Sequence, residues 1–148
     1  MEKTWYALLA FAIAWLIAQV WKTIWGLIKG YKSNQPVNLA SIIDYVTRSG
    51  GMPSGHTASL TAMVVCLGYI SGYGSAAFIL GIGMWLIVVY DAIHVRYAVG
   101  EQGKALNELL QEAKKPVLPV VEGHTVPQVI VGAIIGVIVG LMVGFWAI

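Results

Sequence analysis

The chain has 148 residues, of which 58% are hydrophobic and only 11% charged, whereas soluble domains average about 25% charged residues. This composition argues against a soluble domain and against a disordered segment, and a net charge of +2 is too small to indicate nucleic-acid binding. About 20 apolar residues cross a bilayer, so four spans fit within this length, and we expect one integral membrane domain over residues 1–148.

The first predicted span covers about residues 5–28 and carries aromatic residues towards both ends, as is typical of a membrane–water interface. A polar connection follows over residues 29–56, in which Asn38 is a candidate cap for a brief helix. The second span covers about residues 57–70. It is short, so we expect it to begin within residues 53–56, where Pro53 suits a first helical turn.

A tight turn at residues 71–74 leads to the third span, at about residues 75–95. A polar stretch over residues 100–115 then repeats its apolar residues at helical spacing, as on a helix that lies at a membrane interface. The last span covers residues 126–146, and glycines recur at every fourth position from Gly132 to Gly144. Such glycines let another helix approach closely, and they are also candidates for a homodimer contact.

These elements predict an all-α fold, a polytopic membrane helix bundle with about four transmembrane helices and a short amphipathic segment before the last. Because consecutive spans alternate in direction, Lys22, His56, Asp91, Arg96 and His124 all fall on one membrane face. Every lysine and arginine except one near the N-terminus lies on or near that face. The positive-inside rule therefore predicts a cytoplasmic polar face and outward termini in the cell's inner membrane.

The polar residues on this face indicate an anionic ligand. All three histidines lie there together with several cations, a combination that suits phosphate. The segment 53–56 adds a hydroxyl and backbone N–H groups at a helix N-terminus, where free donors and the helix dipole favour anions.

At these residues the sequence becomes recognisable. Residues 51–58, Gly-Met-Pro-Ser-Gly-His-Thr-Ala, resemble the second signature of the type 2 phosphatidic acid phosphatase superfamily, which is related to acid phosphatases and vanadium haloperoxidases. Three further segments, at 18–22, 90–102 and 123–132, make the chain similar to the divergent branch of that superfamily. The resemblance covers roughly residues 5 to 145.

The resemblance implies a membrane-embedded phosphatase that hydrolyses a lipid or isoprenoid phosphate monoester or diphosphate. His124 would be the nucleophile and would form a phosphohistidine. Gln128, four residues on, would orient it where the superfamily has Asp; glutamine accepts the N–H bond but supplies no charge. His56 would protonate the leaving group as a general acid.

The same resemblance assigns phosphoryl binding to Lys22 and Arg96, joined by Ser54 and the N–H of Gly55. Arg48 is a weaker candidate. The implied partners are membrane lipids and the substrate, and no cofactor or metal is implied.

The chain also departs from the superfamily pattern. The final signature joins its Arg and His within a few residues, but Arg96 and His124 are 28 residues apart in this chain. We expect an insertion between them, which Glu101 and Gln102 would cap or brace. Asp91 would pair with Lys22 or Arg96, or orient the general acid.

Two other functions stay open. Asp91 and His94 share a helix face and Glu101 follows, so these residues could hold a divalent ion for phosphoryl transfer. Alternatively, the uncharged Gln128 fits a lipid-phosphate-binding or transport protein with a degraded site. Simpler roles also exist for the cations, since Lys22 can snorkel to the headgroups and Arg96 can anchor a span end.

Overall fold

The structure is a computed structural model that describes residues 3–32, 43, 50–120 and 123–148. Within these residues all regular structure is helical. The elements are α1 (Trp5–Lys32), α3 (Gly55–Ser71), α4 (Ala76–Tyr90), a π-helical turn η1 (Asp91–Val95), α5 (Arg96–Glu112) and α6 (Val126–Trp146). The predicted all-α helix bundle is confirmed. The brief helix predicted near Asn38 lies outside the described residues.

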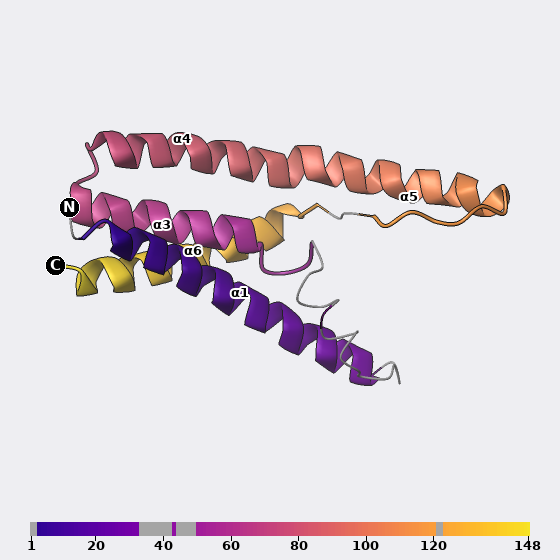
Figure 1. Ribbon diagram of the computed structural model, residues 1–148, viewed down its shortest axis with the longest axis horizontal. Helices are drawn as coiled ribbons and strands as arrows, with labels where there is room; N and C mark the ends of the chain where they lie inside the picture. The colour runs from indigo at the N-terminus through magenta and orange to yellow at the C-terminus, as the bar shows by residue number, and fades with distance from the viewer. Residues whose placement is uncertain (1–2, 33–42, 44–49, 121–122) are drawn as a thin grey trace.

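Helix α3 is at the centre of the bundle and contacts α1, α4 and α6. Figure 1 shows both termini and the α3–α4 connection at one end of the bundle, and the start of α3, the start of α6 and the α4–α5 junction towards the other. Alternation of the helices therefore gathers the polar segments at one end, as the sequence predicted.

Three segments are long and apolar enough to cross a membrane: α1, the continuous stretch Ala76–Glu112, and α6. The predicted second span is present as α3, but its 17 residues measure only about 26 Å along the axis, less than the hydrocarbon core of about 30 Å. Ser54 caps α3, so Pro53 precedes the cap and does not occupy the first helical turn as predicted.

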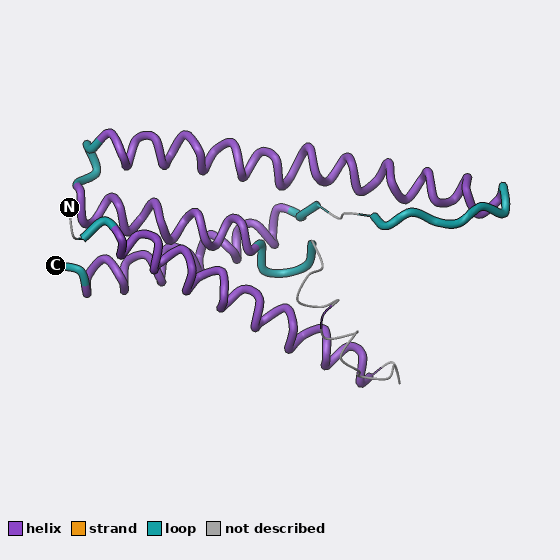
Figure 2. Tube along the Cα trace, in the orientation of Figure 1, coloured by secondary structure: helices purple, strands orange, loops and turns teal. Residues whose placement is uncertain are grey.

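The amphipathic stretch differs from the prediction. It begins at Arg96 and continues the axis of α4 through η1, so that α4, η1 and α5 form one helical rod of 37 residues (Figures 1 and 2). No proline interrupts the chain between α4 and α5, and the π turn keeps the backbone bonded across the junction. The stretch therefore extends beyond the bundle and does not turn aside as a separate interfacial helix.

The bundle core consists of small residues. Apart from glycines and Pro53, the buried apolar residues in the described part of the chain are alanines, valines and one cysteine. Helix α1 contributes a stripe of alanines that the sequence did not predict: Ala7, Ala10, Ala14 and Ala18. The glycine stripe of α6 faces α3, and a Cβ on Gly136 would lie 2.5 Å from the carbonyl oxygen of Ala58. The stripe thus serves packing within the chain, and the predicted homodimer stays a prediction.

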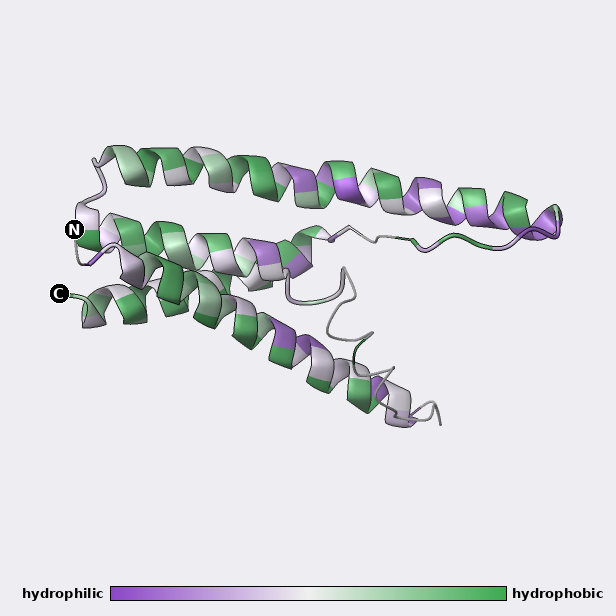
Figure 3. Cartoon of the chain, in the orientation of Figure 1, coloured by the Kyte–Doolittle hydropathy of each residue, from purple (hydrophilic) through white to green (hydrophobic). Residues whose placement is uncertain are grey.

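The large apolar side chains face outwards, in the reverse of the soluble arrangement. Trp15 is 44% exposed, Leu16 53% and Ile79 62%. Helices α1, α4 and α6 consist largely of hydrophobic residues (Figure 3). Close packing through small residues and large apolar side chains directed outwards are typical of helices in lipid. This is an integral membrane protein.

Candidate active site

The site is built around His124, at the end of the bundle where α6 begins. Its side chain is buried, with 5% of the residue exposed. Its ring Nδ1 lies 3.3 Å from Oε1 of Gln128, in the first turn of α6. The same Oε1 accepts a hydrogen bond of 3.0 Å from the backbone N–H of Thr125, the N-cap residue. Gln128 thus caps its own helix and contacts the imidazole with one oxygen.

This shared oxygen favours one tautomer of His124. The N–H of Thr125 can only donate, so the amide of Gln128 must present its oxygen to it. An oxygen can pair with Nδ1 only if Nδ1 carries the proton. In that tautomer the neutral imidazole has its lone pair on Nε2.

The surroundings of His124 also favour the neutral imidazole. Burial lowers the pKa of His124, because desolvation disfavours the charged ring, and the positive charge of Lys22 lowers it further. Hydrogen bonds from the ring to Gln128 and to the backbone of Gly51 act in the opposite direction but are smaller effects. A neutral ring near pH 7 is what nucleophilic attack requires.

The N-terminus of α3 lies against the first turn of α6, because the N–H of Ser54 donates to the carbonyl oxygen of Gln128 at 3.0 Å. Ser54 itself is fully buried, and its hydroxyl lies 2.9 Å from the hydroxyl of Thr57 and accepts from the backbone N–H of Thr57. The hydroxyl predicted to bind phosphate is therefore the helix cap. The N–H groups of Gly55 and His56, in the first turn of α3, have no carbonyl acceptor within the helix.

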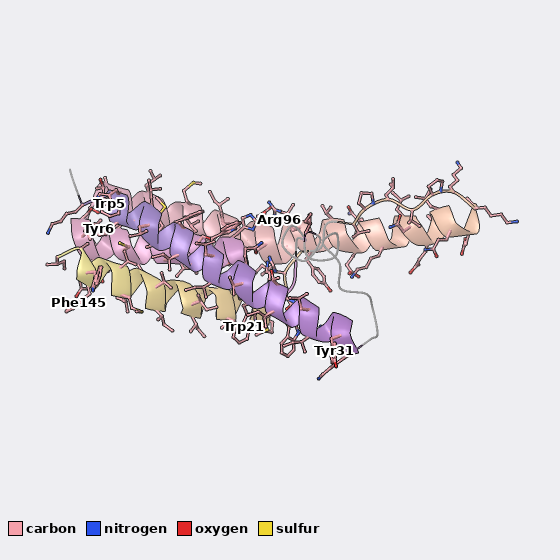
Figure 4. All side chains as sticks on the ribbon, turned by 60° about the horizontal axis from the view of Figure 1, so that its bottom comes forward. Trp5, Tyr6, Trp21, Tyr31, Arg96 and Phe145 are labelled. Atoms are coloured by element: carbon pink, nitrogen blue, oxygen red, sulfur yellow. The ribbon has the colours of Figure 1, made fainter. Side chains whose placement is uncertain are left out.

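The two cations predicted to bind phosphate both lie within electrostatic range of His56, and one of them also lies within range of His124. The charges of Lys22, Arg96 and Asp91 act on His56 at the start of α3, and the charge of Lys22 also acts on His124. The structure therefore brings together residues from α1, α3, the α4–α5 junction and α6. Figure 4 shows Arg96 at that junction, where the bundle ends and α5 extends beyond it.

Asp91 is the partner of Arg96, one of the alternatives that the sequence left open. Its Oδ2 lies 2.5 Å from Nε of Arg96, and both side chains are partly exposed, at 39% and 44%. Residues five apart do not face each other on an α-helix, where each residue turns by about 100°. The π turn, with its i to i+5 bonding, brings them to the same side.

Two predicted supporting residues lie elsewhere. Glu101 and Gln102 are exposed on α5, and Glu101 pairs with Lys104 at 2.9 Å. The brace that they were expected to provide comes instead from Asn107, whose side chain donates to the carbonyl of Leu118 and accepts from its N–H, both at 2.8 Å. An asparagine inside a polar helix gave no sequence signal for this role. Arg48 lies outside the described residues.

The residues suggested for a divalent ion do not form a ligand set. Within the described part of the chain no three His, Cys, Asp or Glu side chains gather as a metal site would require. Asp91 pairs with Arg96, and the ring of His94 stacks on Tyr90 with centroids 4.4 Å apart.

The chain is similar to a known protein family and to a bacterial membrane protein. The family described as the Divergent PAP2 family matches residues 4–139. An uncharacterized membrane protein of Bacillus subtilis, YuiD, is 37% identical over 65 residues, which are 44% of this chain and 41% of that protein. The chain therefore matches about two fifths of the length of this curated relative. No solved structure matches the chain.

Proposed function

The chain belongs to the Divergent PAP2 family, and we propose that it is a membrane-embedded phosphatase that hydrolyses a lipid or isoprenoid phosphate, as a monoester or diphosphate, through a phosphohistidine. One observation carries the proposal. His124 is buried, its surroundings favour the neutral ring, and Gln128 contacts its Nδ1 with an oxygen that also caps the helix. A structural histidine before a helix needs none of these features.

In the proposed first step, Nε2 of His124 attacks phosphorus in line with the leaving oxygen. The N–P bond forms as the P–O bond to the lipid breaks, and the departing oxygen takes a proton from His56. The positive charge that develops on His124 is shared with the oxygen of Gln128 through the Nδ1 proton.

In the second step water attacks the phosphohistidine. His56, now neutral, accepts the proton of the water, the N–P bond breaks, and inorganic phosphate leaves with both histidines restored. Lys22, Arg96 and the first-turn N–H groups of α3 stabilise the charge on the equatorial oxygens in both transition states.

The fold suits a substrate whose tail lies in the bilayer. The site is at one end of a bundle with an apolar outer surface, so a lipid tail can lie beside the helices while its phosphate reaches the polar end. The excess of lysine and arginine at this end supports a cytoplasmic orientation.

The test is release of inorganic phosphate by the purified protein from phosphatidic acid, phosphatidylglycerophosphate and prenyl phosphates, with and without a chelator. We expect turnover that the chelator leaves intact and that His124→Ala and His56→Ala abolish. His94→Ala is the matched control, because His94 stacks on Tyr90 and takes no part in the proposed steps. A phosphorylated His124 peptide in rapidly quenched samples would identify the intermediate, and turnover by both His124→Ala and His56→Ala would refute the mechanism.

A second candidate function is binding of lipid phosphate without catalysis, which the uncharged Gln128 favours. In that case no substrate is turned over, while inorganic phosphate or vanadate still binds and binding is weakened by Lys22→Gln. Activity lost in chelator and restored by magnesium or manganese would instead support the metal-dependent alternative.

A further inference from the structure

The described residues of the segment before His124 contact α5 at several points. The segment leaves the end of α5 and returns antiparallel to it. Asn107 holds Leu118 by two hydrogen bonds, and Gly103 faces Val120 further along. Two extended residues from Leu118 to Val120 cover about 7 Å, and four helical residues from Asn107 to Gly103 about 6 Å, so the two segments stay aligned.

The attachment is tightest next to the nucleophile. A Cβ on Gly123 would lie 2.3 Å from the backbone nitrogen of Tyr97 and 2.5 Å from the carbonyl carbon of Arg96. These are backbone atoms of the first turn of α5 and cannot move aside as a side chain could. A glycine at position 123 therefore lets the returning segment lie directly on the backbone of α5.

The π turn provides a further contact, with the backbone of His124. In an α-helix the N–H of Arg96 would donate to the carbonyl of Ala92, but in η1 it donates to that of Asp91. The carbonyl oxygen of Ala92 is thereby released, and it accepts a hydrogen bond of 3.0 Å from the backbone N–H of His124. The same turn that aligns Asp91 with Arg96 thus also binds the backbone of the nucleophile.

We propose that Gly123 and the π turn Asp91–Val95 together position His124 beside the α4–α5 junction that carries Arg96, across a separation of 28 residues in the sequence. Gly123 is a positioning residue, since it touches neither phosphate nor the reacting atoms. The inference rests on the proposed function for its catalytic consequence, but the docking of His124 can be measured without turnover.

The test compares Gly123→Ala with Gly103→Ala, two glycine substitutions on the same structural unit. The Cβ at position 123 must move by about 1 Å to reach ordinary contact with backbone, and a misplacement of that size can cost about 10²-fold in rate. We expect kcat to fall accordingly, with KM nearly unchanged because the phosphate-binding groups are intact. The Cβ at position 103 would meet the Val120 side chain at 3.2 Å, which can yield, so Gly103→Ala should match the parent.

A second readout follows the docking itself. Diethyl pyrocarbonate modifies neutral, accessible imidazoles, so buried His124 should react slowly in the parent and several-fold faster in Gly123→Ala, while exposed His56 and His94 react equally in both. Asn107→Ala removes two hydrogen bonds without a clash and should accelerate modification of His124 in the same direction, by less. If Gly123→Ala does not fold, the rate of His124 modification in Asn107→Ala tests the positioning proposal.

The outcomes separate the two proposals. Unchanged kcat and unchanged His124 reactivity in Gly123→Ala, or equal losses of kcat in Gly123→Ala and Gly103→Ala, would overturn the positioning proposal. A parent protein that turns over no lipid phosphate but shows the expected reactivity pattern would remove the phosphatase function and leave the positioning of His124 standing.

Discussion

Replacing Gln128 with Glu should make the proposed phosphatase faster and more sensitive to acid. The glutamine oxygen lies 3.3 Å from Nδ1 of His124 and 3.0 Å from the N–H of Thr125. Glutamate can make both contacts, and it is a preferred residue at this third helical position beside a Thr cap. The fold should therefore tolerate Gln128→Glu, and the added negative charge is the principal change at the nucleophile.

The size of the effect follows from the kind of hydrogen bond. A bond to a charged group stabilises by about 1 kcal/mol more than a neutral one. That difference raises the pKa of His124 and, for a fully developed imidazolium in the transition state, corresponds to about five-fold in kcat. The two effects have opposite consequences for activity, because protonated His124 cannot attack phosphorus.

The assay is a pH profile of kcat/KM for the parent, Gln128→Glu and Gln128→Leu. We expect the acid limb of Gln128→Glu to move to higher pH and its plateau to rise. Leucine accepts neither hydrogen bond, so Gln128→Leu should lose up to about 10⁴-fold, the loss seen when a catalytic histidine takes the wrong tautomer. An acid limb that moves to lower pH in Gln128→Glu, or a Gln128→Leu enzyme as fast as its parent, would refute the proposed role of the shared oxygen.

Three further predictions concern the site and the bundle. Burial and the nearby lysine lower the pKa of His124, so the acid limb of the kcat/KM profile of the parent, which reports protonation of His124, should lie below pH 6.5; an acid limb above pH 6.5 would contradict this. Asp91→Asn removes a partly exposed pair worth up to about 1 kcal/mol, so KM should rise by up to about five-fold as Arg96 loses its orientation, and a fall in kcat alone would argue against that role. Gly136→Ala places a Cβ 2.5 Å from a backbone oxygen and should destabilise the fold by about 1–3 kcal/mol, as followed by thermal melting in detergent. Gly83→Ala, whose Cβ would meet no atom within 4 Å, should melt at or above the melting temperature of the parent. Equal melting temperatures for the two variants would count against the packing argument.

Much of the arrangement followed from the sequence because connectivity in a membrane restricts it. Once four apolar segments are accepted, their alternation alone places Lys22, His56, Arg96 and His124 at one end, and the structure brings them within electrostatic range. The glycine spacing of α6 likewise predicted a close helix contact, which the structure assigns to α3. These inferences depend on the spacing of residues along each helix and on the order of the helices, and no single side chain changes either.

Local hydrogen bonding was not predictable in the same way. A serine at a helix start can bind a ligand or cap the helix, and only the contact with Thr57 shows that Ser54 caps. A π turn needs a single extra residue in the helical register, and the sequence Asp-Ala-Ile-His-Val has no feature that marks it. Because the π turn could not be predicted, the sequence could not show that Asp91 pairs with Arg96, five residues on, and not with Lys22.

The small-residue packing of the bundle extends into the site itself. Gly132 is the first glycine of the α6 stripe, and a Cβ there would lie 2.5 Å from the carbonyl oxygen of Ser54 and 3.3 Å from its nitrogen. That nitrogen donates to the carbonyl of Gln128, so the approach of α6 to α3 sets the distance between the proposed phosphate-binding end of α3 and the residue that contacts His124. Lipid supplies no hydrophobic force between helices, and their separation depends on how closely small residues let the backbones approach. In this bundle the contacts that stabilise the fold therefore also fix the geometry on which the proposed chemistry depends.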